Sequence, residues 1–194
     1  MSGDLYISAD IEADGPIPGP YSMLSFGLAV AGSYDGEALR PAAPEPPTFY
    51  RELKPISARF EPEALAVSGL DRDQLCVEGC DPPDAMGEAK EWIREQAGDR
   101  LPVMVAYPAV FDWMFMYWYF VRFAGGSPFG VSGSLDMKTM FQQKARVTID
   151  RALRTQLPPP LRSARPHTHH ARDDALEQAE IFVRLFEWKG EPGP

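Results

Sequence analysis

The segment Leu5–Glu12, near the start of the chain, constrains the fold more than any other stretch. Apolar and polar side chains alternate along it, which is typical of a β-strand with two different faces. One face would carry Leu5, Ile7, Ala9 and Ile11, and the other Tyr6, Ser8, Asp10 and Glu12. Two carboxylates on one strand face are costly unless something neutralises them, and Mg²⁺ and Mn²⁺ prefer oxygen ligands. Asp10 and Glu12 are therefore candidate metal ligands, although the same pattern also fits a strand whose polar face meets water.

Length and composition predict one domain. The chain has 194 residues, 44% of them hydrophobic, which is enough to bury a full core. We expect a single domain over residues 1–194, with its core at about 4–188 and loop-rich stretches at 34–47 and 155–168. No apolar run approaches the roughly 20 residues that a membrane-spanning helix needs, and the first residues lack the basic and apolar regions of a signal peptide.

The two cysteines, Cys76 and Cys80, are most simply interpreted as reduced thiols of a cytoplasmic protein. A zinc site that combined them with the histidines at 167, 169 and 170 would join distant segments, and the histidine spacing does not fit a zinc finger. The net charge of −9 argues against a general binder of duplex DNA. The segment 137–171 nevertheless carries seven Lys and Arg residues against Asp150 alone. This segment could line the path of a polyanion, or it could be a solvated helix face followed by a loop.

The remaining pattern predicts a mixed α/β sheet flanked by helices. Strands at about 5–12, 22–31 and 49–53 would form an antiparallel meander, in which Gly27 could allow a close backbone approach. The pattern then alternates, with expected helices at 62–67, 84–96, 112–124, 137–145 and 171–188, a buried strand at 102–107 and a short strand reaching Leu135. Asp136 is expected to cap the helix that follows it. Aromatic residues make the helix at 112–124 apolar almost all round, which predicts burial on more than one side, a homodimer contact or a base-stacking wall.

Two more acids and a histidine extend the set that begins with Asp10 and Glu12. Asp112 follows a buried strand, at the kind of sheet end where functional groups commonly lie. Asp174 lies in the first turn of the last helix, on the inward face that it shares with Ala171. His169 precedes Asp174 by five positions, where an imidazole could take a proton from a metal-bound water.

These motifs, in this order, resemble the DEDDh 3′–5′ exonucleases, which have a ribonuclease H-like fold. The resemblance covers residues 4 to about 188 and rests on three motifs: Asp10-Ile11-Glu12, then Phe111-Asp112, then His169 and Asp174 with four residues between them, where Ala175 follows Asp174. The register selects His169 over His167 and His170. Members often have an Asn where this chain has Pro108, and a Thr-Gly pair where it has Ala13-Asp14-Gly15.

The resemblance implies a metal-dependent 3′–5′ exonuclease that releases nucleoside 5′-monophosphates from the 3′ end of single-stranded DNA or RNA. Two divalent cations, Mg²⁺ or Mn²⁺, would be held by Asp10, Glu12, Asp112 and Asp174, and His169 would be the general base. Substrate contacts are expected from Ala13, Asp14, Gly15 and Phe111, although a loop-capping role suits Asp14 better. The alternatives are an exoribonuclease restricted to short RNA and a catalytically silent nucleic-acid-binding module on the same fold.

Overall fold

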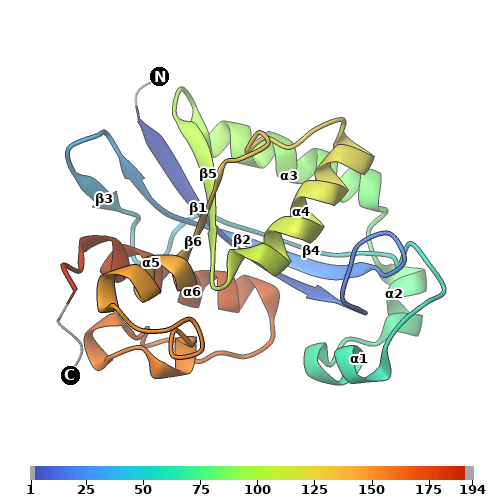
Figure 1. Cartoon of the computed structure of the whole chain (residues 1–194). Coiled ribbons are helices and arrows are strands. Elements are labelled where there is room, and N and C mark those ends of the chain that lie inside the picture. Colours follow the sequence, from blue (N-terminus) through green and yellow to red (C-terminus); the bar gives the residue numbers. More distant parts are fainter. Residues whose placement is uncertain (1–2, 191–194) are drawn as a thin grey trace.

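The computed structural model describes residues 3–190, and a mixed six-stranded sheet lies at its centre (Figure 1). The strands are β1 (Asp4–Ala13), β2 (Met23–Tyr34), β3 (Leu39–Pro41), β4 (Thr48–Glu52), β5 (Leu101–Ala106) and β6 (Ser134–Asp136). The helices are α1 (Pro62–Ser68), α2 (Arg72–Glu78), α3 (Pro82–Ala97), α4 (Ala109–Ala124), α5 (Met137–Ala145) and α6 (Ala171–Glu187), with two 3₁₀ turns at Arg154–Gln156 and Pro159–Leu161. The predicted mixed sheet flanked by helices is confirmed, while residues 1–2 and 191–194 of the predicted domain lie outside the described part.

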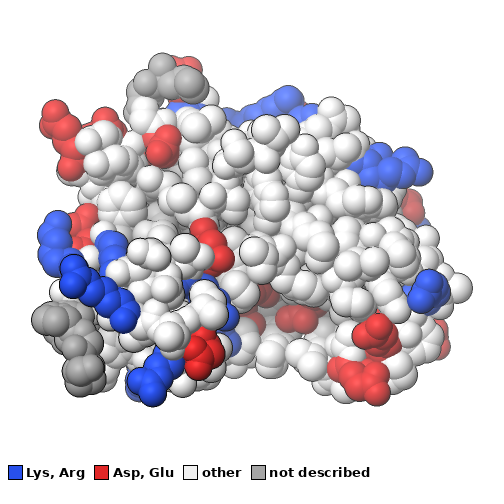
Figure 2. Space-filling model, in the orientation of Figure 1, with Lys and Arg blue, Asp and Glu red and all other residues white. Residues whose placement is uncertain are grey.

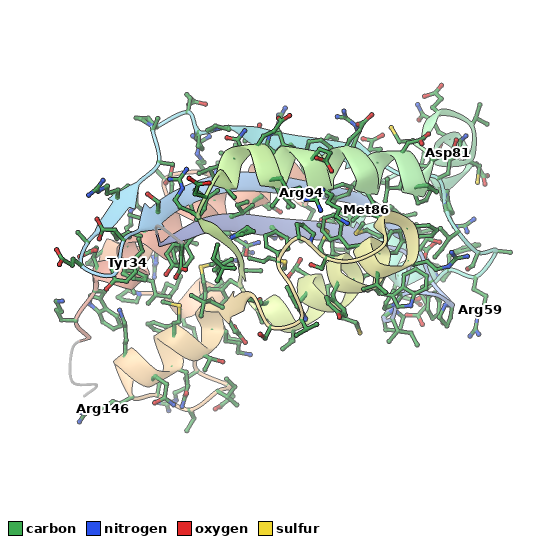
Figure 3. The ribbon with its side chains drawn as sticks, turned by 90° about the horizontal axis from the view of Figure 1, so that it is seen from above. Tyr34, Arg59, Asp81, Met86, Arg94 and Arg146 are labelled. Atoms are coloured by element: carbon green, nitrogen blue, oxygen red, sulfur yellow. The ribbon has the colours of Figure 1, made fainter. Side chains whose placement is uncertain are left out.

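Strand β1 is the centre of the sheet. It pairs antiparallel with β2 and parallel with β5, in the order β3-β2-β1-β5-β6, and β4 pairs with β2 on the meander side. Its apolar face, including Ile7, packs into the core with α3 and α4. Figure 3 shows the side chains of that layer, with Met86 of α3 among them. On the opposite face, the ring of Tyr6 packs 4.7 Å from that of Phe182 in α6. The strand is therefore covered on both sides, and its polar residues are held inside the protein.

Several elements differ from the prediction. Strand β2 runs to Tyr34 rather than to residue 31, because Tyr34 pairs with Asp4 at the far end of β1. The stretch 34–47 is not only a loop, since it contains β3. Helix α2 was not predicted, because Leu75 is its one buried residue and it therefore shows no apolar stripe. The capping role of Asp136 is confirmed, since its side chain accepts hydrogen bonds from the first N–H groups of α5.

Helix α4 begins at Ala109, one turn earlier than predicted, directly after Pro108. Its inner face, which includes Phe115 and Tyr119, is fully buried. The expectation of burial on further sides is wrong for its outer face, where Val110 and Val121 are 69% and 49% exposed. A homodimer contact or a base-stacking wall on this face stays a prediction. Across the described residues, no helix combines the length and apolarity that crossing a bilayer would need.

Gly27 brings two distant segments together, as its place in the second strand suggested. It pairs with Asp10 in the sheet. A Cβ atom at this position would lie 2.3 Å from the carbonyl oxygen of Ala171, so the first turn of α6 rests directly on the β2 backbone. Only glycine permits this approach without displacement of one backbone by the other. The first turn of α6, which carries Asp174, is thereby brought close to the strand pair that carries Asp10.

We expect Gly27→Ala to lower the free energy of unfolding by about 1–3 kcal/mol, because the added methyl group meets backbone atoms that cannot rotate away. Gly87→Ala in α3 is the matched control. A Cβ at Gly87 meets nothing within 4 Å, and alanine is favoured over glycine within a helix by about 0.5–1 kcal/mol. Urea unfolding of the two variants and the parent protein would check this. Equal stability of Gly27→Ala and the parent would contradict the close approach.

Candidate active site

Three carboxylates from two distant elements meet in one place. Asp10 and Glu12 come from β1 and Asp174 from the first turn of α6, and one oxygen atom from each lies within 4.8 Å of the others. Asp174 is fully buried and Glu12 is 9% exposed. Figure 2 shows acidic atoms at the back of a hollow between α1 and the segment that precedes α6. The structure thus brings together three of the four acids that the sequence singled out.

Asp112 lies outside this group of three but is tied to it. It is 6% exposed, and its Oδ1 atom accepts a hydrogen bond of 3.1 Å from the backbone N–H of Ile11. Ile11 is the residue between Asp10 and Glu12. Asp112 therefore anchors the first turn of α4 to the point on β1 where the acidic pair projects.

Burial of several acids together makes the ionised site costly. Burial raises the pKa of Glu12 to about 8, and the charges of Asp174 and Asp112 add to the effect. Burial raises the pKa of Asp112 to about 7. The pKa of Asp10 lies well above its usual value, chiefly through burial and then through the charges of Asp112 and Glu12. A cation that neutralised these carboxylates would remove the cost, and a donor set made of oxygen atoms fits Mg²⁺ or Mn²⁺.

The loop before α6 wraps around the carboxylate of Asp174. The backbone N–H of Thr168 donates to Oδ1 at 2.8 Å, and that of His169 donates to Oδ2 at 2.9 Å. His169 adopts a left-handed backbone conformation, with φ of 56°, which allows this turn. Asp174 therefore holds the histidine loop as well as belonging to the acidic group.

Two histidines, rather than one, lie beside Asp174. The Nδ1 atom of His167 lies 2.9 Å from Oδ2 of Asp174, and the rings of His167 and His169 are 4.5 Å apart. Glu177 accepts from Nη1 of Arg154 at 2.7 Å, and both side chains contact His167. Burial, followed by the charge of Arg154, lowers the pKa of His167. The motif register did not assign a role to His167, Arg154 or Glu177, because the fold alone brings their segments together.

His170 points elsewhere, since its ring stacks on Tyr50 at 4.5 Å. The zinc site that the sequence disfavoured gains no support from the positions of the cysteines. Cys76 and Cys80 are exposed, and neither belongs to a group of potential metal ligands within residues 3–190.

The residues expected to contact substrate are only partly accessible. Asp14 is fully buried, where it accepts hydrogen bonds from the backbone N–H of Ser22 and from Arg72. This arrangement agrees with a loop-capping role. Ala13 is also buried, and a Cβ on Gly15 would collide with the ring of Tyr21. Phe111, one residue before Asp112, is 38% exposed and its ring lies 5.1 Å from that of Phe115, so of these four residues it is the one most open to a substrate.

A buried amide beside Asp10 was not found from the sequence. The side chain of Gln178, which is 2% exposed, donates from Nε2 to Oδ1 of Asp10 at 2.7 Å. Its Oε1 atom accepts from the backbone N–H of Tyr107 at 2.6 Å. Gln178 follows Asp174 by four residues, so helical spacing places the two on the same face of α6. This four-residue spacing is the sequence feature from which Gln178 could have been predicted.

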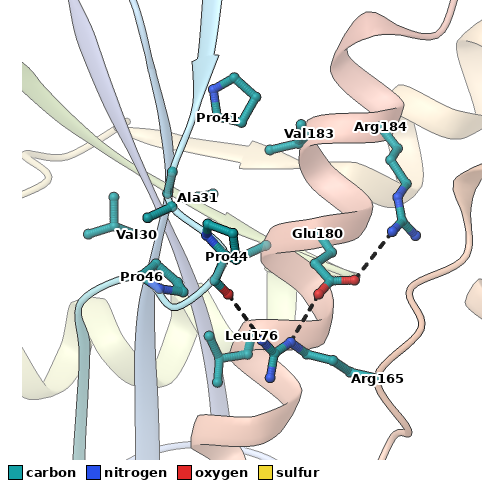
Figure 4. Close-up of a pocket in the computed structure, with 13 residues that line it drawn as sticks. Val30, Ala31, Pro41, Pro44, Pro46, Arg165, Leu176, Glu180, Val183 and Arg184 are labelled. Atoms are coloured by element: carbon teal, nitrogen blue, oxygen red, sulfur yellow. Dashed lines mark hydrogen bonds and ion pairs between the residues drawn. The ribbon is translucent and has the colours of Figure 1, made fainter.

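A separate cavity of about 200 Å³ lies between the 41–46 segment and α6 (Figure 4). Its lining is mainly apolar, and none of the four acids lines it. Arg165 at its edge binds Glu180 of α6 at 3.0 Å and also donates to the carbonyl oxygen of Pro44. Arg165 thus links the loop that carries the histidines to α6 and to the neighbouring connection.

Solved structures share this fold. The nuclease domain of 3′hExo, a DEDDh family member bound to rAMP, superposes with a TM-score of 0.68 and 14% identity, over 99% of this chain and 97% of that one. Exonuclease I of E. coli, in complex with a dT13 oligonucleotide, gives a TM-score of 0.64 and 14% identity over 96% of this chain and 41% of that one. In sequence, this chain is 37% identical over 180 residues to the 3′–5′ DNA exonuclease Cap18 of Escherichia coli, covering 92% of this chain and 90% of that protein. This chain belongs to the DEDDh 3′–5′ exonuclease family.

The protein is accordingly a 3′–5′ exonuclease, a hydrolase of phosphodiester bonds in nucleic acid. DEDDh exonucleases use divalent metal, and the acids at residues 10, 12 and 174 of this family member could bind it. The sequence matches no protein-family model.

The raised pKa values predict how the metal-free protein responds to pH. Glu12, whose pKa rises from 4.5 to about 8, and Asp112, whose pKa rises to about 7, favour the folded state when they are protonated. A raised folded-state pKa contributes stability below the unfolded pKa, and that stability is lost as pH rises through the folded pKa. The contribution of Glu12 to the free energy of unfolding should therefore fall between pH 4.5 and about 8 in EDTA, and Mg²⁺ should offset the fall. Urea unfolding with and without Mg²⁺ measures this, with Glu12→Gln as the control that makes the fall in EDTA smaller. Identical pH profiles under both conditions would contradict it.

Proposed function

We propose that the chain hydrolyses single-stranded DNA from its 3′ end and releases nucleoside 5′-monophosphates. The observation that carries this proposal is the meeting of Asp10, Glu12 and Asp174 within 4.8 Å, inside a hollow of the surface. Family membership supplies the direction of cleavage, and the geometry supplies the place where the scissile phosphodiester would be held.

The acids have distinct parts in this proposal. Asp10, Glu12 and Asp174 would bind a pair of divalent cations, Mg²⁺ or Mn²⁺, and Asp112 would support the pair from its position against Ile11. When bound, such cations neutralise the phosphodiester charge and lower the pKa of water. The anchored loop holds His169 beside Asp174, and a ring nitrogen of His169 would accept the proton of the attacking water.

DNA is the proposed substrate because the Escherichia coli relative is named a 3′–5′ DNA exonuclease. Two of the solved structures with this fold are E. coli exonuclease I in complex with a dT13 and with a dA16 oligonucleotide. The charges around the hollow are also unequal on its two sides, which suits a single nucleic-acid strand that enters from the basic side. In Figure 2, Lys and Arg side chains gather around α5 and the segment after it, whereas acidic side chains lie on the side of α1 and α2. Exposed Arg151 and Arg162 belong to the basic side.

Short RNA is the second candidate substrate, since the structurally similar 3′hExo nuclease domain is bound to rAMP and another structure with this fold recognises a histone mRNA stem-loop.

We also propose that residues 1–194 form a single domain, with its core at about 4–188. A cytoplasmic location is likewise proposed, on the strength of the two free, exposed cysteines.

The substrate proposal is tested with matched single-stranded DNA and RNA of several lengths, each labelled at the 5′ end. With Mg²⁺ or Mn²⁺ we expect a ladder of shortening products from DNA, faster than from RNA, and none in EDTA. Faster cleavage of RNA at every length would favour the second candidate, and no cleavage of either would favour a silent binding module.

Neighbouring acids in α6 provide the matched control for that assay. Asp174→Asn should lower kcat by more than about 100-fold, since even partners outside the ligand set typically cost 10–100-fold. Asp173 faces outward and pairs with Arg172, so Asp173→Asn should retain parental activity. Equal activity of the two variants would remove Asp174 from the site.

The two neighbouring histidines can be separated by substitution. His169→Ala should lower kcat by about 10²–10⁴-fold, the usual contribution of a general base. His167→Ala should cost far less, because His167 is engaged with Glu177. Calorimetric titration with Mn²⁺ should give parental affinity for His169→Ala, since its proposed role is in proton transfer. A larger loss in His167→Ala than in His169→Ala would reverse the assignment.

A further inference from the structure

A buried amide joins the three elements that carry the acids. Gln178 of α6 reaches Asp10 of β1 with one end of its side chain and the backbone of Tyr107, directly after β5, with the other. Tyr107 and Pro108 lead into α4, the helix of Asp112. Gln178, on the helix of Asp174, therefore binds Asp10 directly and also binds the backbone that leads into the helix of Asp112.

The orientation of the amide follows from its partners. A backbone N–H can only donate a hydrogen bond, so the atom that faces Tyr107 must be the carbonyl oxygen Oε1. The other end is then the NH₂ group, and it must face Asp10. Its distance of 2.7 Å from Oδ1 of Asp10 is that of a well-formed hydrogen bond. At 2% exposed, the amide has little access to water as an alternative partner.

This contact restricts the carboxylate of Asp10. A free aspartate side chain rotates about two bonds, and its oxygen atoms can face in several directions. Here one oxygen, Oδ1, is held by Gln178, so the rotation of the carboxylate is limited and its other acceptor positions stay available. The same carboxylate belongs to the group of three that meets within 4.8 Å, with Glu12 and Asp174.

We propose that Gln178 is a positioning residue for the metal site, which holds the Asp10 carboxylate in the orientation in which divalent cations can share it. This inference rests on the proposed function. Partners of metal ligands in general orient those ligands, and their substitution typically weakens metal affinity by 10–100-fold. The alternative is a buried amide that serves only to satisfy the Tyr107 N–H and fill space between α6 and the sheet.

The test is Gln178→Met, which keeps the length of the side chain but cannot donate to Asp10. Calorimetric titration of the metal-free protein with Mn²⁺ should show a dissociation constant raised by about 10–100-fold. In activity assays the Mg²⁺ concentration for half-maximal rate should rise in parallel. The KM for single-stranded DNA at saturating Mg²⁺ should stay near the parental value, because Gln178 would not touch the substrate.

Ala179→Gly is the matched control for loss of stability. Ala179 is the next residue of α6, is buried in the core and lines the separate cavity, which none of the four acids lines, so glycine should lower Tm and leave Mn²⁺ affinity unchanged. If Gln178→Met does not fold, Gln178→Asn replaces it, since the shorter amide cannot span Asp10 and Tyr107 together and should weaken Mn²⁺ binding in the same way.

Parental Mn²⁺ affinity in a folded Gln178 variant would overturn the inference and leave the proposed function intact. Absence of cleavage of both DNA and RNA by the parent protein would instead contradict the proposed function itself, whatever Gln178 does. The two failures are therefore distinguishable.

Discussion

Mutual repulsion and desolvation of buried carboxylates is the constraint around which this protein is arranged. Burial raises the pKa values of Asp10, Glu12 and Asp112, and the charges of the neighbouring acids add to this effect at Asp10 and Glu12. Gathering these carboxylates in one place lowers the free energy of unfolding unless cations are bound. Hydrogen bonds from the backbone offset part of that cost. The N–H groups of Thr168 and His169 donate to Asp174, and the N–H group of Ile11 donates to Asp112.

The close approach at Gly27 makes this gathering possible. Asp10 and Asp174 are separated by most of the chain, and they meet because the first turn of α6 rests on the backbone of β2 beside β1. An ordinary side chain at Gly27 would hold the helix away. The same helix then contributes Gln178, so a single packing contact positions both a candidate metal ligand and the amide that fixes another.

The walls of the hollow are held by ion pairs of a different kind. On one side, buried Asp14 binds Arg72 and ties the loop after β1 to the start of α2. On the other, Arg165 binds Glu180 and the connection before β4, which anchors the loop that carries the histidines. These pairs join loops to regular elements, so the segments around the acids are fixed although they contain little regular structure.

The sequence by itself determined the sheet, its principal helices and the identity of the acids. Alternation along β1, the apolar run of β5 and the stripe of α6 follow from local periodicity, and the order of the three motifs indicated the family. Short or polar elements such as α2 and β3 were not predicted, because they are stabilised by neighbouring segments and show no clear periodicity of their own. The exposure of the outer face of α4 was also not predicted, because the composition of a helix does not show which side faces the core.

Only the tertiary structure decided which side chains meet. It brought Arg154 against Glu177, enclosed Asp14 in the protein and brought Gln178 against Asp10. None of these contacts lies within one element, and each depends on how α6 and the loops pack on the sheet. The physical reason is that periodicity fixes the face on which a residue lies, whereas the partner across that face is set by the packing of segments far apart in the chain.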